Sequence, residues 1–146
     1  AEIAGAFGIH QLPRLEGLIQ IRRDNAAYFN KALAPYEEWL QLPVEAPNTR
    51  HSYFSYPITV KEGAPFSRAK LVSFLENKGL ETRPIESGNM AIQPAMKRIN
   101  YLVSGSLSNA QYIHDNGFFF GLHQGVGLVE REAIVNYFGE FMKECV

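Results

Sequence analysis

The side chains best suited to bind a polar ligand lie in residues 81–94, a segment of charged and amide groups that begins within a short run predicted to be a strand. Arg83 is permanently charged, and its planar fork of donors suits carboxylate and phosphate groups. Glu81 either faces the same ligand or forms an ordinary ion pair with Arg83, as Glu86 could also do. The residue types alone leave both interpretations open.

Ser87, Gly88 and Asn89 follow directly. Glycine allows a ligand to approach the backbone closely, and the neighbouring serine and asparagine offer donors and acceptors to a polyhydroxylated molecule. An ordinary polar surface loop would have the same composition. We therefore treat these three residues as candidate ligand contacts.

His123 is a further candidate ligand contact, because it ends the apolar run 118–123 just before a glycine turn. Side chains at such positions project into clefts. His10 and His114 fall on predicted helices, where a surface or hydrogen-bonded histidine is more common. No histidine has a partner four residues away or a nearby cysteine, so we predict no metal site.

Two short motifs are better explained by local structure. Ser67 and Lys70 have the spacing of an acyl-transfer serine and its lysine, but Ser67 is also placed to cap a helix. Gly125 and Gly127 begin a G-x-G pattern without the third glycine or the surrounding alternation of strand and helix, and this favours a turn.

The elements that position these residues follow from the apolar periodicity. We expect helical sequence that kinks or stops at Pro13, an amphipathic helix over 13–34, and at most a short strand or turn over 39–42. Residues 53–60 alternate as a half-buried strand, with Phe54 on the buried face, and Pro57 favours an edge strand or a local break. Further predicted elements are a helix from Ser67 to Gly79, a strand over 80–85, a loop over 86–105, a helix over 106–117, a strand over 118–123 and a terminal helix.

This order predicts an α/β (α+β) fold, with a sheet of about three strands and helices on one face. The 146 residues are 46% hydrophobic and fit one domain. A formal net charge of −1, with no basic run, argues against a nucleic-acid partner. The sequence has no apolar stretch long enough to cross a membrane and starts without a basic signal region, so we expect a cytoplasmic protein.

The first 33 residues, with Glu2-Ile3, Gln11-Leu12, Arg22-Arg23, Asn25 and Tyr28, resemble the interdomain helices of the DegT/DnrJ/StrS family. These are pyridoxal-phosphate-dependent sugar aminotransferases of fold type I. The resemblance continues through "YFSYPITV", "GLETRPIESGN" and "GFFFGLHQGVGL", and so covers the chain as the family's carboxy-terminal third. It implies interdomain helices at 1–34 and a small C-terminal domain with a mainly antiparallel sheet at 35–146.

Within the family, "TRPIESGN", "SGSLSNA" and "GLHQG" are most similar to the nucleotide-sugar 3-dehydratases, which use pyridoxamine phosphate to remove the C3 hydroxyl of a 4-keto-6-deoxyhexose. Leu102 departs from the arginine expected there. One alternative is a sugar aminotransferase, which carries a lysine at the cofactor position where the dehydratase has a histidine. Another is a non-catalytic ligand-binding or interaction module.

The resemblance also implies a division of labour. The cofactor and the acid/base residue belong to an N-terminal domain outside this chain, so we expect no catalytic, cofactor-binding or metal-binding residue here and no turnover or bound pyridoxal phosphate in the chain alone. Arg83 and Glu81 would face the sugar or diphosphate, Ser87, Gly88 and Asn89 would line the pocket, and His123 would lie nearby. The implied partners are a nucleotide-diphosphate sugar, the N-terminal domain and a second subunit in a homodimer.

Overall fold

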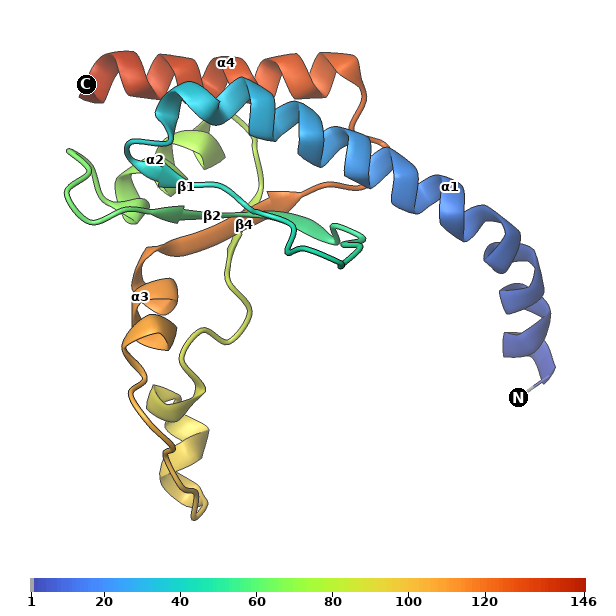
Figure 1. Cartoon of the computed structure of the whole chain (residues 1–146), viewed down its shortest axis with the longest axis horizontal. Helices are drawn as coiled ribbons and strands as arrows, with labels where there is room; N and C mark the ends of the chain where they lie inside the picture. The colour runs from blue at the N-terminus through green and yellow to red at the C-terminus, as the bar shows by residue number, and fades with distance from the viewer. Residues whose placement is uncertain (1) are drawn as a thin grey trace.

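The computed structural model describes residues 2–146, and its longest element is helix α1 (Glu2–Leu33). Pro13 lies inside this helix and does not divide it, so the predicted sequence of two helices was wrong. A proline removes one backbone hydrogen bond and bends a helix, and the first turns of α1 run at an angle to the rest (Figure 1). The remaining backbone bonds keep the helix continuous.

Only the C-terminal part of α1 is buried. Ala26, Phe29 and Leu33 are at most 1% exposed, whereas Phe7 and Leu12 are 70% and 73% exposed. The helix therefore contributes to the core through its last turns and presents an apolar face to solvent at its start.

The sheet has the order β1-β2-β4-β3 and is antiparallel throughout. Its strands are β1 (Leu40–Gln41), β2 (Ser55–Val60), β3 (Thr82–Pro84) and β4 (Gly117–Gly121). Three of these were predicted as strands, and the fourth, β1, is the short segment whose strand character the sequence left open. The expectation of three strands was one too few, because a two-residue strand shows no periodicity of its own.

Pro57 is tolerated in β2, although this strand has a neighbour on each side. The Lys61 N–H donates to the Trp39 carbonyl beside β1 at 2.8 Å, so odd-numbered N–H groups of this segment face β1. The register pairs β1 only with Thr59 and Val60. Pro57 thus lies beyond the end of β1, at a locally open edge where no N–H is needed.

Phe54 does not lie on the buried face, contrary to the prediction, and is 70% exposed. Tyr53 has a φ of 47°, which turns the chain just before the strand, and its own ring is buried. The strand alternation therefore begins at Ser55. Tyr56, Ile58 and Val60 are buried as predicted.

The remaining helices are α2 (Arg68–Asn77), α3 (Ser108–Asn116) and α4 (Leu128–Cys145). Ser67 caps α2 by accepting the Lys70 N–H at 3.2 Å, and Gly79 follows with a φ of 91°, as predicted. The predicted loop contains two 3-10 turns, Met90–Ile92 and Pro94–Arg98, and a third, Ala34–Tyr36, follows α1. Among the helices of residues 2–146, none is long and apolar enough to cross a membrane.

Aromatic rings from four elements meet in the core. Phe120 of β4 lies 5.3 Å from Phe29 of α1, 5.2 Å from Tyr56 of β2 and 6.3 Å from Phe138 of α4, measured between ring centroids. Helices α1 and α4 lie next to each other over one face of the sheet, while α3 and the segment that precedes it extend away from the other side (Figure 1). This leaves β3 and the following loop accessible.

An ion pair between Arg23 and Glu45 holds the loop between β1 and β2 against α1. Arg23 donates to both oxygens of Glu45, at 2.8 and 3.0 Å, and the His51 N–H donates to Glu45 at 2.6 Å. The Arg23 hydrogen bonds, aided by the His51 N–H, lower the pKa of Glu45 from 4.5 to about 2. The ionised form of Glu45 is therefore favoured in the folded state.

We expect the hydrogen bonds of Glu45 to Arg23 and His51 to make the stability of the protein depend on pH. Because the pKa of Glu45 is depressed on folding, its contribution is fully present above pH 4.5 and is lost as the pH falls toward about 2. Glu45→Gln should flatten the dependence of the free energy of unfolding on pH in this window, as measured by urea denaturation. The exposed Glu62→Gln is the control, and equal slopes in the two variants would contradict the assignment.

Candidate binding groove along strand β3

Three adjoining hollows follow β3 and the loop after it, and together we call them the β3 groove. The Arg83 hollow has a volume of about 360 Å³, the Phe54 hollow about 530 Å³ and the His114 hollow about 410 Å³. Arg83 and Phe119 line both of the first two, and Pro84 and Glu86 line both of the last two. The three hollows therefore adjoin one another at these shared residues.

The Arg83 hollow brings together three predicted site residues, Arg83, Glu81 and His123, with walls of apolar side chains from β4 and α4. Arg83 donates from Nε and Nη2 to Glu81 Oε1, at 3.0 and 2.6 Å. Both side chains are mostly exposed, and exposed ion pairs contribute little to stability. A ligand can therefore take the place of Glu81 at small cost.

His123 is oriented by the turn after β4. The strand ends at Gly121, two residues before the histidine, and the Gly125 N–H donates to His123 Nδ1 at 3.0 Å. This bond assigns the ring proton of the neutral form to Nε2, which remains available as a donor. A Cβ on Gly125 would lie 2.9 Å from the ring, so glycine is needed for this arrangement.

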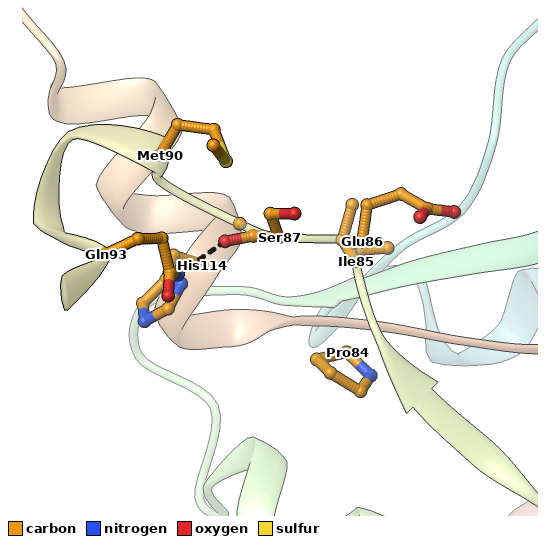
Figure 2. Close-up of a pocket in the computed structure, with 8 residues that line it drawn as sticks. Pro84, Ile85, Glu86, Ser87, Met90, Gln93 and His114 are labelled. Atoms are coloured by element: carbon orange, nitrogen blue, oxygen red, sulfur yellow. Dashed lines mark hydrogen bonds between the residues drawn. The ribbon is translucent and has the colours of Figure 1, made fainter. Parts of the chain in front are cut away.

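Ser87 and Gly88 lie in the His114 hollow, on the other side of Glu86 from the Arg83 hollow. Gln93 Nε2 donates to the Ser87 carbonyl at 2.7 Å, and this bond closes the loop beside His114 (Figure 2). The Ser87 and Glu86 side chains point away from the His114 ring in the same view. The two predicted groups of site residues thus share one groove but occupy different parts of it.

Asn89 is placed differently from its neighbours. Its side chain is 4% exposed, donates to Gln111 Oε1 at 3.0 Å and accepts the Ala91 N–H at 3.1 Å. The amide oxygen thus caps the 3-10 turn Met90–Ile92, while the amide nitrogen ties the loop to Gln111 of α3. In this structure Asn89 shapes the loop, and its polar atoms are engaged by the protein.

The structure also places in the groove residues that sequence reasoning did not select: Phe54, Glu86, Gln93, His114 and Phe119. His114 was interpreted as an ordinary helical histidine because nothing near it in sequence marks a site. Glu86 was considered only as a possible partner of Arg83. Within residues 2–146, no group of three His, Cys, Asp or Glu side chains is placed to hold a metal ion.

We expect Gly88→Ala to destabilise the protein by about 2–3 kcal/mol, because Gly88 has a φ of 58° and a Cβ there would overlap the His114 ring. Gly63→Ala is a matched control, since Gly63 has a φ of 88° but open space around it. It should lose only about 1 kcal/mol from the backbone conformation. If urea denaturation gave the same loss of unfolding free energy for both variants, the contact with His114 would be unimportant for stability.

The four helices and the small four-stranded antiparallel sheet match the C-terminal portion of a fold-type I pyridoxal-phosphate enzyme. The profile of the DegT/DnrJ/EryC1/StrS aminotransferase family matches residues 1–138. The chain belongs to this family.

Among its relatives, the chain is 32% identical over 140 residues to the lipopolysaccharide biosynthesis protein RfbH of Salmonella typhimurium, covering 96% of the chain and 32% of that protein. It is 35% identical over 126 residues to the GDP-4-keto-6-deoxy-D-mannose 3-dehydratase of Yersinia pseudotuberculosis, covering 84% and 31%. The structure of the E. coli GDP-4-keto-6-deoxy-D-mannose-3-dehydratase with bound hydrated PLP superposes with a TM-score of 0.84 at 32% identity, covering 93% and 34%. The chain therefore spans about a third of the length of these relatives.

Proposed function

We propose that this chain is the C-terminal portion of a nucleotide-sugar 3-dehydratase that removes the C3 hydroxyl of a 4-keto-6-deoxyhexose. The observation that carries the proposal is the similarity to GDP-4-keto-6-deoxy-D-mannose 3-dehydratases over most of the chain, at 32–35% identity. The β3 groove supports it with a guanidinium, a carboxylate and an imidazole around one hollow. Such a set can hold a polar, negatively charged sugar nucleotide.

The cofactor of the complete enzyme would be pyridoxal or pyridoxamine phosphate, which supplies an electron sink for carbanion chemistry beside the ketone. The residues of this chain do not fit as its anchor. None of the hollows of the β3 groove is lined by a lysine, and the lysines of α1, α2 and α4 are exposed. The cofactor and the acid/base residue would therefore come from the rest of the protein.

The role proposed for this chain is to position the substrate. Arg83 would bind the diphosphate or a sugar oxygen. Glu81, released from its ion pair, would accept a hydrogen bond from a sugar hydroxyl, and His123 would donate a hydrogen bond to the substrate from Nε2. Ser87 and Gly88 would line the groove further along. Asn89 would hold the loop that carries them.

We further propose the division into interdomain helices at 1–34 and a small domain at 35–146, in a cytoplasmic homodimer. The exposed apolar residues at the start of α1 support its role as an interdomain helix, because exposed apolar surface usually marks a contact. The N-terminal domain is the proposed occupant of this face.

The test is to incubate the complete protein with pyridoxamine phosphate and GDP-4-keto-6-deoxy-D-mannose and to follow the sugar by mass spectrometry. The expected product lacks the C3 oxygen. A sugar that instead gains an amino group at C4 would identify an aminotransferase, the second candidate, which the family's own description favours. If the sugar is recovered with neither change, the non-catalytic module is the better description of the protein.

A further inference from the structure

Helix α3 is tied to the loop of the β3 groove by three hydrogen-bonded side chains, Asn89, Gln111 and Asp115, which we call the amide relay. The Ala91 N–H donates to Asn89 Oδ1 at 3.1 Å, and Asn89 Nδ2 donates to Gln111 Oε1 at 3.0 Å. Gln111 Nε2 donates in turn to Asp115 Oδ2 at 2.9 Å. The relay therefore joins the residue after Gly88 to the end of α3.

The direction of each bond in the relay is fixed by the bond before it. A backbone N–H can only donate, so the Asn89 atom that faces Ala91 must be the amide oxygen. The Asn89 nitrogen then faces Gln111, whose oxygen accepts and whose nitrogen is left to donate to Asp115. An ionised carboxylate can only accept, so Asp115 suits the far end of the relay.

The stability of α3 alone does not explain Asp115. It is the next-to-last residue of this helix, where the helix dipole disfavours a carboxylate. A hydrogen bond from Gln111, four residues earlier, stabilises an isolated helix only slightly. The carboxylate has a clearer effect on Gln111, because a charged acceptor makes a stronger hydrogen bond and so fixes which way the amide points.

The relay ends on a buried group beside the groove. Asn89 is 4% exposed, and Gly88 precedes it in the His114 hollow. Gly88 also lies against the His114 ring, so α3 contacts the loop at a second point. The helix is itself fixed, because Arg68 Nη1 donates to the carbonyls of His114 and Gly117, each at 3.1 Å. The loop is thus held by an anchored helix.

We propose that Gln111 and Asp115 are positioning residues, which act through Asn89 to hold the loop of the β3 groove in its substrate-binding conformation. Neither Gln111 nor Asp115 lines a hollow of the groove, so neither would touch the substrate. A loop that is ordered in advance lowers the entropic cost of binding. Loss of the relay should therefore raise KM more than it lowers kcat. This inference rests on the proposed function, because a sugar nucleotide must be the ligand.

The test exchanges the two ends of the relay in the complete protein. Asn89→Asp places a carboxylate where the relay needs a donor, so the Gln111 amide oxygen meets a carboxylate whichever way it turns. Asp115→Asn alone keeps the relay, since an amide oxygen can still accept from Gln111. In the double variant the new amide at position 115 can turn and donate, so both side-chain bonds reform in the opposite direction.

Steady-state kinetics with pyridoxamine phosphate and GDP-4-keto-6-deoxy-D-mannose measure the effect. Asn89→Asp should raise KM about tenfold and change kcat by less than about threefold. Asp115→Asn should keep KM within about threefold of the wild type, and the double variant should return to the same range. Gln111→Leu should raise KM as Asn89→Asp does, and adding Asp115→Asn should not restore it.

Gln20 and Asp24 provide a matched control on α1. Gln20 Nε2 donates to Asp24 Oδ1 at 2.8 Å, across the same spacing of four residues, and neither residue lines the β3 groove. Asp24→Asn should have the kinetics of the wild type, both alone and combined with Asn89→Asp, where it should give no rescue. Circular dichroism should show all the variants folded.

Hydrogen–deuterium exchange of residues 86–93 without substrate gives a second readout. Because Asn89 accepts the Ala91 N–H and ties the loop to Gln111, exchange should be faster in Asn89→Asp than in the wild type. The double variant should return to the wild-type rate. If Asp115→Asn does not slow the exchange of Asn89→Asp, the relay does not hold the loop.

The outcomes separate this inference from the function on which it rests. If the wild type converts the sugar but Asp115→Asn does not lower the KM of Asn89→Asp, the positioning role is wrong and the proposed function stands. The same conclusion follows if exchange changes in the expected way while KM does not. If the wild type neither binds nor converts the sugar, both proposals fail.

Discussion

If the proposed function is right, replacing Arg83 by alanine in the complete protein should lower kcat/KM for the proposed sugar nucleotide by on the order of a hundredfold, since about two charge-assisted hydrogen bonds are lost. Arg83 lies at the junction of two hollows, and its ion pair with Glu81 is exposed, so its donors are available to a ligand. The measurement is steady-state kinetics with varied substrate concentration. Because the role proposed for Arg83 is to position the substrate, a large share of the loss should appear in KM.

Two further variants sharpen this test. Arg83→Lys should recover only part of the loss, because an ammonium cannot replace the planar fork of a guanidinium. Arg98→Ala removes an exposed arginine that lines no part of the β3 groove, and it should behave like the wild type. A change of less than about threefold in Arg83→Ala would exclude a substrate contact.

Phe120→Ala should lower the free energy of unfolding by about 3–5 kcal/mol, the usual range for removing a buried phenylalanine. The ring is 1% exposed and contacts rings from α1, β2 and α4, so its removal leaves a cavity that no single element can close. Urea denaturation followed by circular dichroism measures the loss. For a domain of ordinary stability, this is a large part of the total.

Leu102→Ala is the control for the core variant. Leu102 is 98% exposed, and its replacement should change the free energy of unfolding by no more than about 0.5 kcal/mol. If Phe120→Ala cost less than about 1 kcal/mol, the four-element packing around this ring would not be the main source of stability.

Several features of the chain were predicted from the sequence because neighbouring residues decide them. The alternation in β2, the Ser67 cap, the positive φ of Gly79 and the apolar stripe of α4 all depend on residues within a few positions of one another. The nearness of Arg83 and His123 was also anticipated, since both were expected at the ends of strands in one small sheet, and both line the Arg83 hollow. Their roles in binding remain predictions.

Other features depended on contacts between distant parts of the chain. Pro13 was expected to limit a helix, and β1 became a strand only by pairing with β2. Phe54 faces solvent because of the backbone turn at Tyr53, which the alternating pattern did not reveal. In each case the local pattern allowed more than one outcome.

The β3 groove also has features set by neighbouring residues and features set by contacts between distant segments. Sequence alone determined that residues 81–89 and 123 carry groups able to bind a polar ligand, because residue type and strand ends are local properties. Only the tertiary structure turned Asn89 inward, brought His114 against Gly88 and placed Phe54 beside Arg83. The physical reason is that such contacts join segments far apart in the chain, and their geometry is set by how the sheet pairs and how the helices pack on it.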